Sequence, residues 1–169
     1  FNPNTIAVNN SAMGNAWFVE NVAVAATPDA EIDAIADIEP LDYVVVGNDF
    51  ADQLDSKHYA KDSADYINMT VYSPNRLEYE YSAANDALAL FSEVYYPGWV
   101  AEVDGQKINL IRANYIMRAA ELPKGKHTLV MSFEPEAYKK GGVMAVISSA
   151  LLLFMFAGLL IMTLFKRKE

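Results

Sequence analysis

The sequence predicts a mostly β domain, an antiparallel sandwich of the immunoglobulin or jelly-roll kind with one short helix, followed by a single transmembrane helix. Runs of alternating apolar and polar residues recur along residues 16–135, and turn-forming residues separate them at spacings of about ten positions. Residues 143–165 then form a run of 23 positions without charge, Pro, Asn or Gln. A helix of that length measures about 34 Å and can cross a hydrocarbon core of roughly 30 Å.

These patterns divide the chain into consecutive segments. Residues 1–15, rich in Asn and small residues, form an irregular N-terminal segment. Residues 16–135 form the sandwich, and residues 136–142 link it to the transmembrane helix of residues 143–165. Residues 166–169 form the tail. Because the last strand runs almost directly into the span, we expect the domain to lie close to the bilayer.

One helix is expected inside the domain. Residues 27–29, Thr-Pro-Asp, supply an N-cap, a proline at the first helical position and an acid in the first turn. Ile32, Ile35 and Ile38 are expected to form its apolar face, and Pro40 is expected to end it.

The strands follow from period-two patterns and turn residues. The runs 67–71 and 77–81 alternate in polarity around a Ser-Pro-Asn-Arg turn, which predicts a hairpin with one buried face. Asp104-Gly105 predicts a second, tight hairpin, because both residues accept positive φ. Further strands are expected at residues 16–25, 43–46, 87–96, 99–103, 106–111, 115–122 and 127–133.

Charge predicts the orientation of the span. Three cations at 166–168 follow it, and Lys139 and Lys140 precede it. The excess favours a cytoplasmic C-terminus, which places the domain outside the cytoplasm. The alternative is a tail-anchored protein with a cytosolic domain. Because the sequence begins without a signal peptide, we expect earlier spans to deliver the domain to the outside.

The composition argues against several classes of partner and functional site. The net charge is −9, and −11 over residues 1–142, which argues against a nucleic-acid partner. The absence of cysteine excludes disulfides and thiol nucleophiles. His58 and His127 show no metal-ligand spacing, and no glycine-rich phosphate loop occurs, so no catalytic residue, metal or cofactor is predicted in this chain. The aspartates between positions 49 and 55 lack the pattern of a calcium loop and predict a solvated acidic loop, with a cation site as the alternative.

The most distinctive stretch is the sequence Tyr-Tyr-Pro-Gly-Trp at residues 95–99. Exposed rings here could stack on a sugar while nearby polar side chains bond to its hydroxyls. Tyr and Trp are also common fillers of a sandwich core, and Pro-Gly would then only kink the edge of a strand. Periodicity does not fix which ring points outward around the kink, so both interpretations stay open. The candidate carbohydrate-binding residues are Tyr95, Tyr96, Trp99, Asp104, Arg112 and Asn114.

Several motifs, taken in order, resemble the C-terminal region of the YfhO-like family of bacterial membrane proteins, in the version found in Bacteroidetes-type bacteria. The resemblance covers most of residues 13–165, and its most specific part is the order Tyr-Pro-Gly-Trp, Asp-Gly, Gly-Lys-His. It is carried by residues 13–17, 92–105, 111–115, 122–127 and 133–135.

The resemblance implies a polytopic protein similar to glycosyltransferases of the GT-C type, which use lipid-linked sugar donors. Gram-positive members are associated with the glycosylation of lipoteichoic acid. Catalytic acids of such enzymes lie in external loops near the N-terminus, so no residue of this chain takes that role. The implied function is an external accessory domain plus the last span of an enzyme that modifies an envelope glycan.

The implied partners are the bilayer, upstream spans of the same protein, and a glycan or lipid-linked sugar. Two alternatives stay open. One is a membrane-anchored carbohydrate-binding or adhesive module, and the other is a structural or assembly module without enzymatic activity.

Overall fold

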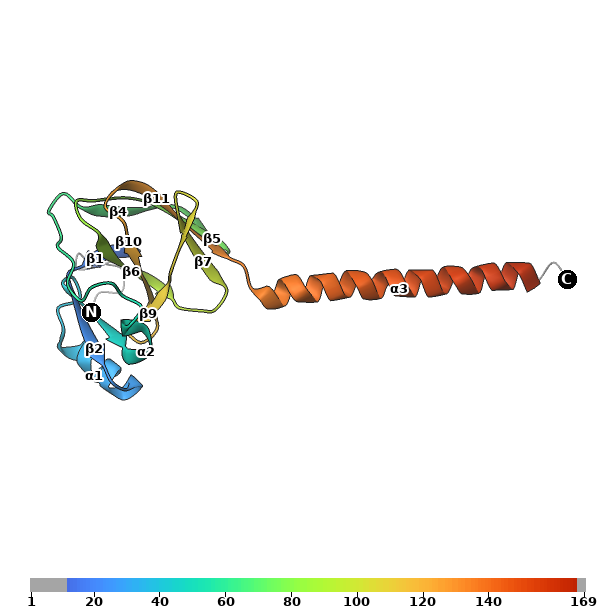
Figure 1. Cartoon of the computed structure of the whole chain (residues 1–169), viewed down its shortest axis with the longest axis horizontal. Helices are drawn as coiled ribbons and strands as arrows, with labels where there is room; N and C mark the ends of the chain where they lie inside the picture. The colour runs from blue at the N-terminus through green and yellow to red at the C-terminus, as the bar shows by residue number, and fades with distance from the viewer. Residues whose placement is uncertain (1–11, 167–169) are drawn as a thin grey trace, which may run out of the picture. The chain divides into compact units, whose positions relative to one another are not determined.

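The computed structural model describes residues 12–166 and divides them into two units, which meet between Phe133 and Glu134 (Figure 1). Most of the predicted N-terminal segment and residues 167–169 of the predicted tail lie outside the described residues. The first unit is the predicted β domain. The second unit is a single long helix.

A four-stranded sheet runs through the middle of the β domain. Its strands lie in the order β1 (Ala16–Val19), β6 (Ala87–Val94), β10 (Met117–Leu122) and β9 (Ile111–Ala113), and every neighbouring pair is antiparallel. A bulge between Met117 and Arg118 shifts the register of β10 against β6.

A five-stranded antiparallel sheet packs against one face of the four-stranded sheet. Its order is β4 (Tyr66–Ser73), β5 (Arg76–Ala83), β11 (Gly125–Phe133), β7 (Trp99–Val103) and β8 (Gln106–Ile108). The two sheets form the predicted sandwich. Their shared core contains Phe18, Ile67, Leu77, Tyr79, Tyr81, Ala83, Ala87, Ala89, Phe91, Ala101, Val103, Ala120, Leu122, Leu129 and Met131.

A third layer covers the other face of the four-stranded sheet. It consists of the parallel pair β2 (Asn21–Ala25) and β3 (Tyr43–Gly47), with the helices α1 (Pro28–Asp37) and α2 (Asn48–Ala51). A parallel pair needs a crossover connection, and here α1 supplies it. This layer was not predicted. It forms a second core with Trp17, Val19, Val44, Val46, Ala51, Tyr59, Leu88, Leu90, Ile111, Ala113 and Ala119.

The third layer explains the apolar composition of β6. Residues 87–91 are all buried, because alternate side chains enter the two cores on opposite faces of the sheet. A strand covered on both faces reads as a continuous apolar run rather than as an alternating one.

Helix α1 begins as predicted, but its apolar face differs. The Thr27 hydroxyl accepts a hydrogen bond from the Ala30 amide at 3.2 Å, and Pro28 is the first helical residue. The one fully buried side chain of α1 is Glu31, whereas Ile32 is 47% exposed. The predicted isoleucine face is therefore wrong in this respect, because the helix uses a carboxylate to contact the rest of the domain.

Two predicted strands are interrupted in the structure. The predicted strand at 16–25 breaks at Glu20 into β1 and β2, which belong to different layers. The predicted strand at 106–111 breaks at residues 109–110, where the chain crosses from β8 in one sheet to β9 in the other. Sandwich chains switch sheets at such bends.

The second unit is helix α3 (Glu136–Lys166). It begins at the first residue of the predicted linker, so residues 136–142 continue the helix. Residues 140–163 are long and apolar enough to cross a membrane.

Candidate binding site around Trp99

The predicted aromatic stretch forms the connection between β6 and β7. Strand β6 ends at Val94, and β7 begins at Trp99. Gly98 has a φ of 107°, a conformation that disfavours any side chain, so the glycine allows the chain to turn back directly before Trp99. Tyr95 is half-buried against Phe50, with ring centroids 5.5 Å apart, while Tyr96 is 61% exposed.

Trp99 packs at the edge of the sandwich core. Its ring centroid lies 5.4 Å from that of Phe133 on β11, and Phe133 also lies 6.1 Å from Tyr96. The Arg118 guanidinium lies over the Trp99 ring, 4.2 Å from the ring centroid. Trp99 therefore fits the interpretation as a core residue, because it packs against the core. Tyr96 fits the interpretation as a sugar-stacking residue, because its ring is exposed to solvent.

Arg118 is a buried cation, with only 2% of its surface exposed. Its Nε donates to the Val94 carbonyl at 2.9 Å, and one terminal nitrogen lies 3.4 Å from the Glu93 carboxylate. The other terminal nitrogen faces the Met131 sulfur, a weak acceptor, at 3.7 Å. Burial lowers the pKa of Arg118, and Glu93 opposes this effect. The cation–π contact with Trp99 compensates part of the lost hydration.

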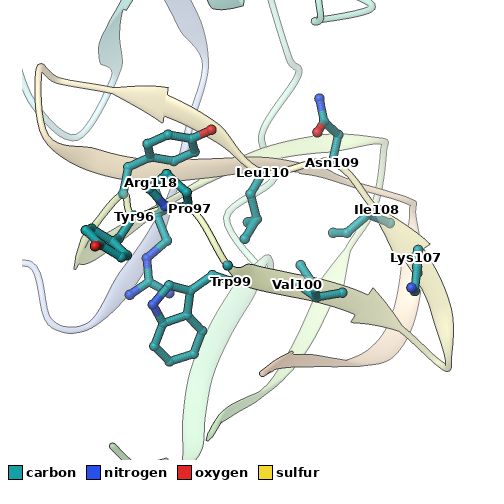
Figure 2. A pocket seen from close by; sticks show the side chains of 12 residues that line it. Tyr96, Pro97, Trp99, Val100, Lys107, Ile108, Asn109, Leu110 and Arg118 are labelled. Atoms are coloured by element: carbon teal, nitrogen blue, oxygen red, sulfur yellow. The ribbon is translucent and has the colours of Figure 1, made fainter. Parts of the chain in front are cut away.

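A hollow of about 270 Å³ lies beside this cluster. Figure 2 shows the guanidinium of Arg118 between Tyr96 and Trp99 on one side, with Leu110 and Ile108 across from them. No carboxylate lines this hollow, although acidic residues outnumber basic ones by 22 to 13 in the chain. Because Tyr96 lines this hollow, a sugar ring stacked on Tyr96 would lie beside it.

Asp104 lies away from this hollow, at the opposite end of β7 from Trp99. It occupies the predicted tight turn, with a φ of 49°, and Gly105 follows with a φ of 81°. The Asp104 carboxylate accepts from the Thr128 amide at 3.0 Å and contacts Nδ1 of His127 at 2.6 Å. These bonds give it a structural role in the hairpin.

Arg112 on β9 and Asn114, which follows β9, both contact residues of the third layer. Arg112 pairs with Glu31 at 3.1 Å and lies over the rings of Phe50 and Tyr115. Asn114 forms hydrogen bonds with both backbone groups of Val45. The side-chain oxygen of Asn114 accepts from the Val45 amide at 2.8 Å, and the backbone amide of Asn114 donates to the Val45 carbonyl at 2.7 Å. Both residues join layers of the domain.

The structure thus brings together three of the six predicted site residues, Tyr95, Tyr96 and Trp99. Sequence reasoning missed Arg118 and Phe133, which complete the cluster. Arg118 had a detectable signal, because a cation within the otherwise apolar start of β10 requires a buried partner.

A larger hollow of about 590 Å³ lies at the other end of the sandwich. The Tyr59 hydroxyl bonds there to the Glu121 carboxylate and to the Ser56 carbonyl at 2.9 Å. Burial raises the pKa of Tyr59. Carboxylates line this hollow, among them Asp55 and Asp86. Across residues 12–166, no group of three or more His, Asp or Glu side chains is placed to hold a metal ion.

Comparison with known protein families gives a match. The model of the family described as "Bacterial membrane protein YfhO" matches residues 51–148, from the end of α2 through strands β4 to β11 and into α3. No match was found among curated proteins or among solved structures.

Proposed function

Because the chain belongs to the YfhO family of bacterial membrane proteins, we propose that it forms the extracytoplasmic accessory domain and one membrane span of a glycosyltransferase. The chain itself supplies no catalytic group in this proposal. The domain helps to position an envelope glycan or a lipid-linked sugar for a transferase site elsewhere in the protein. The observation that carries the proposal is the family match, which joins the sandwich to the apolar helix.

The hollow beside Trp99 is the surface that we propose for glycan contact. Tyr96 offers an exposed ring there, and the buried Arg118, which lies over the partly buried Trp99, holds the loop that carries it. Aromatic faces are suited to the apolar faces of sugar rings. Tyr95 anchors the loop to the domain, because its ring packs edge-on against the ring of Phe50.

The proposed location is the bacterial inner membrane, with the domain in the periplasm and the C-terminus in the cytoplasm. The cations at 166–168 support this orientation. Upstream spans of the same protein and the bilayer are the proposed partners of the chain.

Sugar transfer tests the proposal. The natural protein that contains this chain is placed in membranes with a lipid-linked sugar donor, and transfer to an envelope glycan is measured. We expect Tyr96→Ala to lower the transfer rate several-fold, because stacking on one aromatic ring contributes on the order of 1 kcal/mol, a factor of about five. Tyr43→Ala removes another exposed tyrosine, which does not line the hollow, and is expected to leave the rate unchanged.

Absence of transfer by the unaltered protein with any donor would refute the transferase role. Equal rates for the Tyr96 and Tyr43 variants would refute the role of the hollow but not the transferase role.

A structural or assembly module is the second candidate, and one observation favours it. Asp104, Arg112 and Asn114 all bond to partners within the domain, which leaves fewer polar groups for a ligand than the sequence predicts. Unchanged transfer after every substitution in the hollow would favour this candidate.

A further inference from the structure

The loops of the sandwich gather at its two ends. Residues 73–76, 95–98 and 114–116 connect strands at the end where β11 finishes at Phe133; we call these three loops, with the adjoining strand termini, the exit end. Pairing places them together, because the Phe133 amide donates to the Asn75 carbonyl at 3.0 Å and Phe133 pairs with Trp99. The far end holds residues 84–86, 104–105 and 123–124.

The two ends differ in composition. The exit-end loops contain no Asp or Glu, whereas the far-end loops contain Asp86 and Asp104. The far-end loops also contain no aromatic or branched aliphatic residue. Four large apolar side chains at the exit end are more than half exposed: Tyr72 at 69%, Tyr96 at 61%, Val94 at 58% and Ile116 at 53%.

Pairing also groups these exposed side chains. Ile116 accepts a hydrogen bond from the Tyr95 amide at 2.7 Å, which sets Ile116 beside the segment between Val94 and Tyr96. Tyr72 pairs with Leu77, one position from the loop whose Asn75 contacts Phe133. Scattered apolar side chains are normal on a protein surface, but a group of them at one end marks an interaction surface.

Chain connectivity places this surface near the membrane. Only Glu134 and Pro135 separate Phe133 from the first residue of α3. Three residue steps reach at most about 11 Å, whatever their conformation. From Glu136 to Val143, where the uncharged run begins, a helix rises by only about 10 Å. The exit end is therefore tethered by its last strand within a short distance of the lipid headgroups.

We propose that the exit end docks on the bilayer surface, with Tyr96 and Ile116 in the headgroup layer. Tyrosine is suited to this layer, because its ring is apolar and its hydroxyl stays hydrated. An acidic domain would be repelled by anionic lipids over most of its surface. The three exit-end loops weaken this repulsion because they carry no carboxylate of their own, although Glu134 follows Phe133 directly. The proposal rests on membrane anchorage and does not require the transferase role.

Spin labels on single cysteines test the proposal, and the absence of native cysteine makes the labelling specific. The full chain is reconstituted in phosphatidylcholine and phosphatidylglycerol bilayers with a label at Tyr96→Cys, at Ile116→Cys or, as a matched far-end control, at Gln106→Cys. A label at Val143→Cys provides a reference within the bilayer. Collision rates with oxygen and with a water-soluble nickel chelate are measured for each.

We expect the ratio of oxygen to nickel collisions at positions 96 and 116 to lie between the ratios at positions 106 and 143. A ratio at both exit-end positions equal to that at position 106 would overturn the proposal. Low collision rates with both reagents would also overturn it, because they would indicate a protein partner. Near-ultraviolet circular dichroism selects folded variants, and the two exit-end positions provide independent measurements.

Discussion

Gly105 holds a backbone conformation that other residues adopt only at a cost. Its φ of 81° follows the φ of 49° at Asp104, which is the geometry of a tight hairpin turn. Gly105→Val is expected to lower the free energy of unfolding by about 1 kcal/mol or more, through backbone strain. No atom lies within 4 Å of a Cβ at this position, so a clash would not contribute.

Thermal unfolding of the full chain in detergent measures this effect. Gly105→Asn is the control, because asparagine tolerates positive φ and is expected to lose less stability. A valine variant that melts at the wild-type temperature would contradict the assignment of the turn.

The Asp104–His127 pair is expected to make stability depend on pH. Both ring nitrogens of His127 face acceptors, Asp104 at 2.6 Å and the Lys124 carbonyl at 3.0 Å, and together these raise the pKa of His127. The Thr128 amide, and then His127, lower the pKa of Asp104. The stability that His127 adds to the folded state is complete below its ordinary pKa of 6.5. It is lost as the pH rises through the raised pKa. The aspartate contribution is present above its ordinary pKa of 3.8 and is lost as the pH falls through the lowered value.

We therefore expect the melting temperature to fall as the pH rises above 6.5. The fall is expected to be smaller in Asp104→Asn, in which His127 no longer faces a carboxylate. His58→Gln is the control, because Nδ1 of His58 faces only the neutral Asn21 amide oxygen, at 2.9 Å. The same pH dependence in Asp104→Asn and in the wild type would show that the pair is not the cause.

At the scale of single residues, sequence predicts local conformation better than it predicts partners. The Thr27 cap and the Asp104-Gly105 turn depend on a few neighbouring residues, and both occur as predicted. The partners of Arg112 and Asn114 are Glu31 and Val45, which are far away along the chain. No local pattern shows such contacts, so the sequence could not predict these partners, and the assignment of Arg112 and Asn114 to a sugar site stays a prediction.

At the scale of elements, Glu31 links α1 to the four-stranded sheet. One carboxylate oxygen accepts from the Tyr115 amide at 2.7 Å, and the other contacts Arg112 at 3.1 Å without forming a hydrogen bond. Tyr115 adopts a φ of 68°, a costly conformation for a tyrosine that its bond to Glu31 helps to hold.

Glu31→Gln is expected to lower the free energy of unfolding by about 2 kcal/mol, less than for a fully buried pair because Arg112 stays partly exposed. The amide keeps the bond from Tyr115 but leaves Arg112 without its carboxylate. Urea unfolding of Glu31→Gln, Arg112→Met and the double variant measures the coupling. Purely additive losses in this cycle would indicate that the ion pair does not stabilise the domain.

Some elements of the domain could be predicted from the sequence, and others could not. The hairpin of β4 and β5 alternates in polarity because one face of its sheet is solvated, and it was predicted correctly. Strand β6 was also predicted, but its continuous apolar run could not reveal that two cores lie on its two faces. The third layer stayed unpredicted because parallel pairing of β2 with β3 depends on a crossover rather than on a turn signal.

At the scale of the whole molecule, the orientation of the span decides which compartment the sandwich occupies. Single cysteines report it, since the chain has none of its own. In cells that express the natural protein, with any other cysteines replaced, we expect Gln106→Cys to react with a membrane-impermeant maleimide in intact spheroplasts. A cysteine added after Glu169 is expected to react only after permeabilisation, because the cations at 166–168 favour the cytoplasm.

The reverse pattern would place the sandwich in the cytosol and support the tail-anchored alternative. It would also remove the basis for contact with an external glycan, while leaving the docking of the exit end on a bilayer possible on the inner face. The labelling therefore separates the compartment, on which the proposed function depends, from the membrane contact, which depends only on the tether between Phe133 and α3.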